Sequence, residues 1–300
     1  MLKTLSVVGA VSLFCLAGDA SAETKSWAAL KGKMPANTAI VVSADIGALR
    51  GTPSFPKLVD WIKSEDKDTG AMLDMVQSTC GTDLPSMFAD VSLALDKSEK
   101  GVIVIGFNGT DKTKLLDCAN KVLAKVDPKM KLTAAAAGKY TEYTMTGESD
   151  KLYAAWLSND VVAISLDKGG KPALDAMLAG QAPSGDLAAY LGKAGATSPV
   201  FAAFSVNDDG FKGGYGTLAI GKTLNLALRL EGMTPKDGEK GRKEVGDSVK
   251  KGIERTKKQP DLQKVFKGVK VGGKGTEVSV DASVPEAALP SLLPAFDKVF

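Results

Sequence analysis

Pairs of short apolar segments separated by tight turns, each pair followed by a helix, recur along this chain. Four such strand–strand–helix units are predicted, at residues 89–126, 151–180, 215–257 and 268–296. Strands joined by a short turn must pair antiparallel, and the helix that follows can cover one face of the sheet. The sequence therefore predicts an α+β fold, with helices packed on antiparallel sheet, in preference to a doubly wound parallel fold.

The first 22 residues have the three parts of a secretory signal peptide. Lys3 supplies a positive charge, residues 5–17 form an apolar run, and residues 20–22 read Ala-Ser-Ala, a typical cleavage site. No later stretch reaches the roughly 18 apolar residues of a membrane span. We therefore expect a soluble exported protein that begins at Glu23 and resides in the periplasm, the outer envelope or the extracellular space.

A Pro/Gly/Ser-containing segment at residues 181–186 is the best candidate for a linker. It separates an N-terminal α+β half, residues 23–180, from a C-terminal α+β half, residues 181–300. The sequence leaves open whether these halves are separate or form one continuous domain.

Histidine is absent from all 300 residues. This absence excludes Ser-His-Asp and Cys-His catalysis, His-ligated zinc and imidazole general-base chemistry. The formal net charge of +3 is too small to indicate a nucleic-acid partner. We expect no catalytic residue, no cofactor and no metal site.

Two cysteines, Cys80 and Cys118, follow the expected cleavage site. In an oxidising compartment, an even number of cysteines without a histidine to activate a thiolate favours a disulfide. Two free structural thiols and a reactive cysteine remain as alternatives.

The segment around these cysteines resembles a known group of proteins. Its most specific element is the motif CGTDL at residues 80–84, followed by VSLA (91–94), GVIV (101–104) and a helix that carries Cys118. Over about residues 36–130 the chain is similar to uncharacterised exported proteins of myxobacteria and their relatives. The resemblance implies export, a shared fold and a Cys80–Cys118 pairing, and it implies no activity.

One motif in the chain matches a sequence pattern that is associated with a specific chemistry. Residues 216–223, GTLAIGKT, match the phosphate-loop pattern G-x-x-x-x-G-K-[ST]. A phosphate loop must open a helix, whereas here Leu224, Leu226, Leu228 and Leu230 alternate with other residues as in a strand. The context predicts a hairpin with its turn at Gly221-Lys222 and no nucleotide site.

Serine–lysine hydrolases need no histidine and are the enzyme class to consider. Ser54–Lys57 fits S-x-x-K and Ser205–Asn207 fits S-x-N, but the third element, K-[ST]-G, is absent. Ser64–Lys67 and Ser248–Lys251 also match S-x-x-K, as expected by chance. We expect Ser54 to cap a helix over residues 54–65. The stretch GDSV (246–249) resembles a hydrolase nucleophile motif whose mechanism requires a histidine.

Two charged segments are candidate binding regions. Asp208-Asp209 could bind Ca²⁺, but no further oxygen ligands follow at regular spacing, which favours a solvated flexible loop over residues 207–214. Residues 236–274 carry 13 Lys or Arg against 6 Asp or Glu. This basic region could bind an anionic surface of lipid or polysaccharide. Its narrow apolar stripe instead favours a helix that packs on a sheet.

These observations favour an exported, non-enzymatic envelope protein with a binding or structural role. The alternative is a protein that holds a lipid or another amphiphile between sheet and helices. A histidine-independent serine–lysine hydrolase is the third class, and it would require a Ser or Asp to converge with a Lys in a cleft.

Overall fold

This computed structural model describes residues 23–167, 170–194, 198–220 and 222–288. The chain forms two units. The N-terminal unit contains Glu23–Gly47 and Ile62–Pro183, and the C-terminal unit contains Ala48–Trp61 and the chain from Ser184 onward. The signal peptide predicted at residues 1–22 lies outside the described residues.

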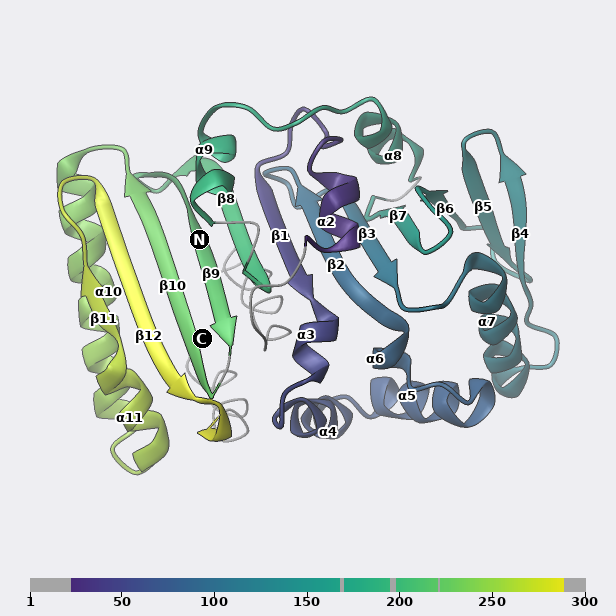
Figure 1. The fold of residues 1–300 in the computed structure, drawn as a ribbon, viewed down its shortest axis with the longest axis horizontal. Coiled ribbons are helices and arrows are strands. Elements are labelled where there is room, and N and C mark those ends of the chain that lie inside the picture. Colours follow the sequence, from purple (N-terminus) through teal and green to yellow (C-terminus); the bar gives the residue numbers. More distant parts are fainter. Residues whose placement is uncertain (1–22, 168–169, 195–197, 221, 289–300) are drawn as a thin grey trace. The chain divides into compact units, whose positions relative to one another are not determined.

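The sheet of the N-terminal unit runs in the order β1-β2-β3-β7-β6-β5-β4 (Figure 1). Every neighbouring pair in this order is antiparallel. The strands are β1 (Ile40–Asp45), β2 (Phe88–Leu95), β3 (Gly101–Phe107), β4 (Leu132–Ala137), β5 (Tyr140–Met145), β6 (Lys151–Trp156) and β7 (Val161–Ser165).

The sheet of the C-terminal unit runs in the order β11-β12-β10-β9-β8, again with antiparallel neighbours. Its strands are β8 (Val200–Asp208), β9 (Phe211–Ile220), β10 (Thr223–Gly232), β11 (Lys270–Gly272) and β12 (Glu277–Pro285). The predicted α+β class with antiparallel strands is confirmed.

Helices follow three of the four predicted strand pairs, and the helix predicted after the fourth pair lies largely outside the described residues. The N-terminal unit has α2 (Lys25–Leu30), α5 (Lys67–Cys80), α6 (Leu84–Met87), α7 (Lys112–Val126) and α8 (Lys171–Leu178). The C-terminal unit has α9 (Gly185–Ala194), α10 (Pro235–Arg255), α11 (Pro260–Gly268) and a 3-10 turn (Glu286–Ala288). Two further helices, α3 (Ile46–Arg50) and α4 (Phe55–Glu65), span the points where the chain passes from one unit to the other.

One face of the N-terminal sheet is sealed by α2 and α8. Ser92, Val104 and Ala163, which pair with one another across β2, β3 and β7, are all completely buried on this face. Leu30 of α2 and Leu174 of α8 are also completely buried. This side of the sheet, the buried face, therefore holds the core of the unit.

A disulfide between Cys80 and Cys118 ties α5 to α7, with their Cα atoms 5.6 Å apart. The disulfide favoured by the sequence is thus present. Gly81 ends α5 with φ of 66°, a left-handed conformation that glycine adopts without strain. A bridge over 38 residues contributes about 4 kcal/mol by restricting the unfolded chain. None of the residues of α7 is fully buried, and the disulfide holds this helix against α5.

Helix α10 lies along one face of β10 and β12 (Figure 1). Its fully buried residues are Gly238, Gly241 and Gly252, whereas Val245 and Val249 of the predicted apolar stripe are half-buried. A Cβ added at Gly238 would lie 2.3 Å from the carbonyl oxygen of Gly275. Glycines therefore let this helix approach the neighbouring backbone closely.

Some sequence predictions were wrong or incomplete. The flexible loop predicted over residues 207–214 is instead a hairpin, in which β8 and β9 pair across a turn at Asp209-Gly210. Both turn residues have positive φ, as tight hairpin turns require. The elements that the sequence reading missed are α2, α3, α6 and β4.

Candidate functional site

The second face of the N-terminal sheet carries large apolar side chains that the helices only partly cover. Because successive side chains of a strand point to opposite faces, Val91 and Leu93 of β2 and Ile103 and Ile105 of β3 lie opposite the buried face. All four are half-buried, whereas Val102 and Val104 on the buried face are completely buried. We call this second side of the sheet the apolar face.

The strand register aligns the apolar face into two rows. Residues that pair across antiparallel strands have side chains on the same side, close enough to touch. One row crosses β5, β6, β7, β3 and β2 through Thr141, Ala154, Ile164, Ile103 and Leu93.

The second row runs beside the first and contains one aromatic residue, on β6. It consists of Trp156, Val162, Ile105 and Val91 on β6, β7, β3 and β2.

A cluster of aromatic side chains lies at one end of the apolar face. The rings of Phe88 and Phe107 lie 5.7 Å apart and those of Phe107 and Trp156 lie 6.2 Å apart, between centroids. Trp156 Nε1 donates a hydrogen bond of 3.1 Å to the hydroxyl of Tyr143. Burial raises the pKa of the Tyr143 phenol above its usual value. Leu115 of α7 packs against this cluster.

Helix α7 borders the apolar face through two polar contacts. The side chain of Asn120 bonds both the N–H and the carbonyl of Leu132, at 2.8 and 3.0 Å. Lys112, the first residue of α7, donates from Nζ to Thr141 Oγ1 at 2.9 Å. Thr141 is buried and begins the first row, so a lysine ammonium lies at one end of that row.

Leu152 extends the apolar face toward solvent. It pairs with Tyr143, lies on the same face and has 47% of its surface exposed.

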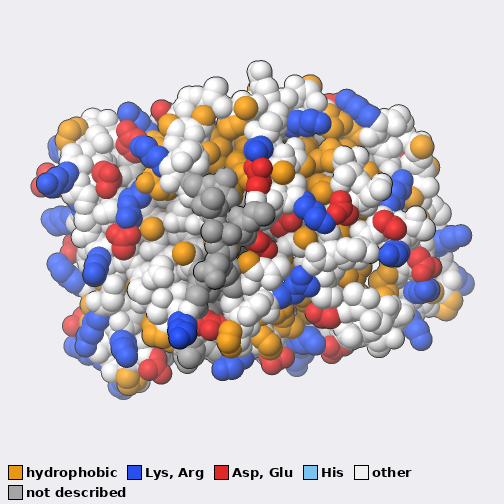
Figure 2. All heavy atoms as spheres, in the orientation of Figure 1, with side chains coloured by type: hydrophobic (Ala, Val, Ile, Leu, Met, Phe, Trp, Pro, Cys, Tyr) orange, Lys and Arg blue, Asp and Glu red, His pale blue; other side chains and the backbone are white. Residues whose placement is uncertain are grey.

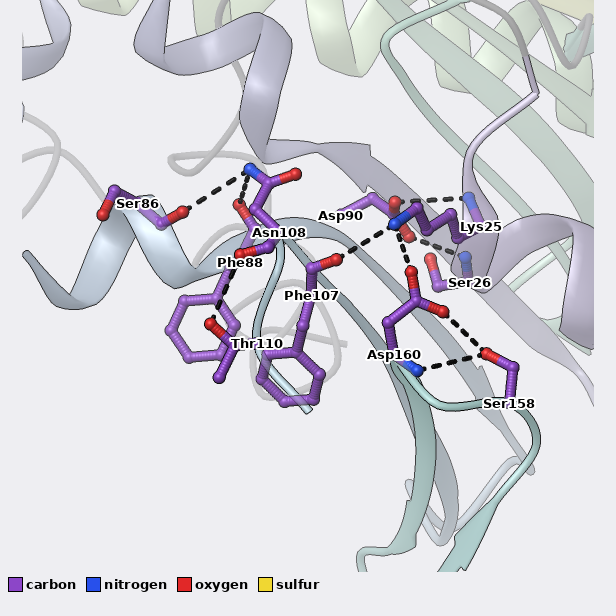
Figure 3. Close-up of polar contacts among 10 residues, drawn as sticks. All are labelled: Lys25, Ser26, Ser86, Phe88, Asp90, Phe107, Asn108, Thr110, Ser158 and Asp160. Carbon is purple, nitrogen blue, oxygen red and sulfur yellow. Dashed lines mark hydrogen bonds and ion pairs between the residues drawn. The ribbon is translucent and has the colours of Figure 1, made fainter. Parts of the chain in front are cut away.

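Polar groups gather on the opposite, buried face around the start of α2 (Figure 3). The carboxylate of buried Asp90 accepts hydrogen bonds from the backbone N–H of Ser26 at 2.6 Å and of Lys25 at 3.2 Å. These bonds satisfy N–H groups that the first turn of a helix leaves without partners. A Cβ at Gly106 would lie 2.7 Å from Asp90 Oδ1, so only glycine leaves room for this carboxylate.

The same cluster continues through hydroxyls and one ion pair. Ser92 Oγ lies 2.8 Å from Ser26 Oγ and 2.9 Å from Ser43 Oγ, all three residues being buried. Lys25 Nζ donates to the carbonyl of Phe107 at 3.1 Å and pairs with Asp160. The Lys25 ammonium and the Ser158 hydroxyl hold the pKa of Asp160 below its usual value. The cluster fastens α2 to the sheet.

Two further polar pairs lie on the C-terminal unit. Tyr190 donates its hydroxyl to Glu231 Oε2 at 2.9 Å, and burial followed by this bond raises the pKa of the phenol. Arg229 pairs with Asp281 at 2.8 Å across β10 and β12. Both contacts join neighbouring elements of the scaffold.

The serine–lysine candidates do not converge. The expectation that the Ser54 side chain caps a helix is wrong, because its hydroxyl donates to the carbonyl of Glu286 at 3.0 Å. The Ser54 carbonyl does accept the N–H of Leu58, as a residue at a helix start does. Lys57 is exposed while Ser54 is buried.

The other matches to this hydrolase pattern lie on separate elements. Ser64 and Lys67 are exposed around the α4–α5 junction, and Ser248 and Lys251 are exposed on α10. Ser205 lies within β8, paired with Gly213.

The phosphate-loop match lies on a hairpin, as the alternating leucines predict. Gly216 to Ile220 belong to β9, Thr223 begins β10, and the two strands pair antiparallel. Gly221 lies outside the described residues. No helix follows the match, so the backbone arrangement of a phosphate loop does not form.

The charged candidates are parts of the scaffold surface. Asp208 accepts the N–H of Asp209 in the β8–β9 turn, and the described residues hold no group of three Asp, Glu or Cys placed to share a metal ion. Figure 2 shows Lys and Arg side chains mixed with acidic ones along α10 and α11. On α10, Lys240 pairs with Glu244 and Lys250 with Asp247. Binding of the basic region 236–274 to an anionic surface stays a prediction.

The chain matches no protein-family model, and no curated protein and no solved structure compares with it significantly. The similarity to exported myxobacterial proteins therefore stays a prediction. In the part of the chain that is described, no helix has the length and apolar character needed to cross a membrane.

Proposed function

We propose that this protein is an exported, non-enzymatic component of the cell envelope that binds an amphiphile on its apolar face. One observation carries the proposal: several large apolar side chains on one side of the N-terminal sheet are only partly buried, whereas Val102 and Val104 on the opposite side are completely buried. Leu93, Ile103 and Leu152 are examples of such side chains. Each CH₂ of an acyl chain buried on this surface would contribute about 0.8 kcal/mol.

Two features support the proposed location outside the cytosol and the proposed lack of catalytic activity. The Cys80–Cys118 disulfide fits an oxidising environment outside the cytosol, in agreement with the signal peptide expected at residues 1–22. The buried hydroxyls of Ser26, Ser43 and Ser92 bond one another. Their mutual bonds serve to hold α2 on the sheet rather than to activate a nucleophile.

Tryptophan quenching tests the proposal. Trp156 borders the apolar face, whereas Trp27 is buried. We expect a neutral monoacylglycerol with a dibrominated stearoyl chain to quench the fluorescence of the mature protein saturably. The Trp156→Phe variant retains Trp27 and Trp61 and should lose most of that quenching. Absence of quenching by both this probe and 9,10-dibromostearate, or equal quenching in the variant, would rule out the proposed surface.

A further inference from the structure

We infer that two copies of this protein pair edge to edge through strand β4 to form a symmetric dimer. β4 is the last strand of the N-terminal sheet (Figure 1). It pairs with β5 on one side, and no described strand lies on its other side. The inference concerns the edge of the sheet rather than its apolar face, so it does not depend on the proposed function.

The hairpin register shows which backbone groups of β4 point outward. β4 and β5 pair along their whole length without a register shift, and just beyond them the Thr146 N–H donates to the Lys131 carbonyl at 3.0 Å. Hydrogen-bonded pairs alternate with non-hydrogen-bonded pairs along an antiparallel ladder, so the odd-numbered residues of β4 bond β5. Leu132, Ala134 and Ala136 therefore direct their N–H and C=O groups away from β5.

This outer edge is closed at one end and open at the other. The side chain of Asn120 accepts from the Leu132 N–H at 2.8 Å and donates to the Leu132 carbonyl at 3.0 Å, as a neighbouring strand would. The outward N–H and C=O groups of Ala134 and Ala136 have no hydrogen-bond partner among the described residues. β4 also has no charged residue and no proline, which edge strands commonly use to prevent pairing with another chain.

One register of a second copy satisfies all four open groups. When the second copy is placed antiparallel about a two-fold axis at Ala135, Ala134 of each copy lies opposite Ala136 of the other. Each of these two pairs then exchanges two hydrogen bonds. The strand of the second copy ends opposite Thr133, because β4 ends at the hairpin turn. The second copy therefore leaves the edge just before the segment that Asn120 closes.

The side chains of β4 favour a second copy over an unrelated extended peptide. Domains that bind a peptide by strand addition obtain their specificity from pockets for alternate side chains. β4 instead ends in four successive alanines, residues 134–137, whose methyl groups are too small to line such pockets. In the symmetric pair these alanines face one another or Thr133, so the two backbones can approach without a clash of side chains.

One pair of like charges opposes the dimer. The register places Lys131 opposite Lys139 of the second copy, but Lys139 Nζ lies 2.5 Å from Asp175 of its own chain, which reduces the repulsion. A contact through one strand is also smaller than a standard protein interface. We therefore expect a reversible dimer that is populated at high protein concentration.

Cysteine cross-linking tests the register. Cys80 and Cys118 are joined to each other, so a cysteine introduced into the mature protein supplies a single free thiol. Mild oxidation should convert Ala135→Cys into a covalent dimer, because the two copies of this residue face each other with Cα atoms about 4.5 Å apart. Intact mass measured without reductant detects the dimer.

Thr133→Cys is the matched control. Its thiol faces Ala137 of the second copy, so this variant should stay monomeric alone and cross-link when it is mixed with Ala137→Cys. Equal cross-linking by Ala135→Cys and Thr133→Cys would overturn the inference, and so would the absence of cross-linking in Ala135→Cys.

Sedimentation equilibrium tests the open N–H groups. Ala136→Pro removes a donor that points away from β5, so the hairpin should remain paired, as circular dichroism can verify. The dissociation constant of the dimer should rise about tenfold or more, because one hydrogen bond is lost on each side of the two-fold axis. Ala136→Val keeps the N–H and should dimerise as the wild-type protein does. A wild-type protein that stays monomeric at millimolar concentration, or an unchanged dissociation constant in folded Ala136→Pro, would contradict pairing through β4.

Discussion

At the scale of single residues, Asp90 shows how a buried charge can be accommodated. An ionised carboxylate is costly to bury unless hydrogen bonds replace its hydration. Asp90 receives two such bonds from the backbone at the start of α2, where the helix dipole also favours negative charge. The residue therefore fixes the position of α2 over the sheet.

Replacing Asp90 with Asn should destabilise the protein by about 1–3 kcal/mol, because the amide cannot accept both backbone hydrogen bonds and leaves one buried donor unpaired. Urea unfolding followed by circular dichroism measures this loss. An unchanged free energy of unfolding would show that Asp90 does not hold α2.

Asp160→Asn is the matched control, since Asp160 contacts the same segment through Lys25 but is partly exposed. It should cost less than about 1 kcal/mol at pH 7. Lys25 lowers the folded-state pKa of Asp160 below the usual value of 3.8. The stabilisation is therefore present above pH 3.8 and is lost as the pH falls through the lower folded-state value. The difference between this variant and the wild-type protein should vanish in acid.

The orientation of β2 could not be predicted from its own residues. The alternation in FADVSLAL is typical of a strand that buries Val91 and Leu93 and exposes Asp90 and Ser92. The structure has the opposite arrangement, because α2 supplies donors to Asp90 and a hydroxyl to Ser92. Since α2 was not predicted, nothing local in the sequence indicated these partners.

At the scale of elements, close helix packing through glycine explains the composition of α10. A helix with several glycines loses stability in isolation, by up to about 1 kcal/mol for each one. Gly238 and Gly246 lie on the same helix but in different surroundings. Backbone atoms crowd Gly238, whereas a Cβ at Gly246 would meet nothing within 4 Å.

Gly238→Ala should therefore destabilise the protein by about 1–3 kcal/mol, because the added methyl group meets the Gly275 carbonyl and backbone cannot move aside. Gly246→Ala should instead stabilise it by about 0.5–1 kcal/mol. Thermal unfolding of the two variants measures the difference. Equal shifts of the same sign would contradict the packing described for α10.

Element types and pairings were largely predictable, since they depend on local periodicity and turn residues. The leucines of β10 and the turn before Thr223 are sufficient to indicate a hairpin. The β8–β9 hairpin was missed because Asp208, Asp209 and Gly210 have the composition of a loop. The pair Asp209-Gly210 is nevertheless typical of a tight hairpin turn, and both residues have the positive φ values that such a turn requires.

At the scale of the whole molecule, the proposed function depends on which face of the sheet the helices cover less completely. Helix periodicity indicates which stripe of α7 is apolar, but not how much of the sheet the helix covers. Strand β3, GVIVIGF, is apolar on both sides, so its sequence does not distinguish Ile103 from Val104. The apolar face can be identified only from the tertiary packing of the helices on the sheet.

The most direct test of the account is the affinity of dibromostearate for a Leu93→Gln/Ile103→Gln double variant. These residues pair in the first row and are half-buried, so their replacement should remove apolar contact while the sheet still folds. The control is Leu226→Gln, an exposed leucine of the C-terminal unit. We predict that the double variant binds at least tenfold more weakly while the control binds as the wild-type protein does. Wild-type affinity in the folded double variant would contradict the assignment of the apolar face as the binding site.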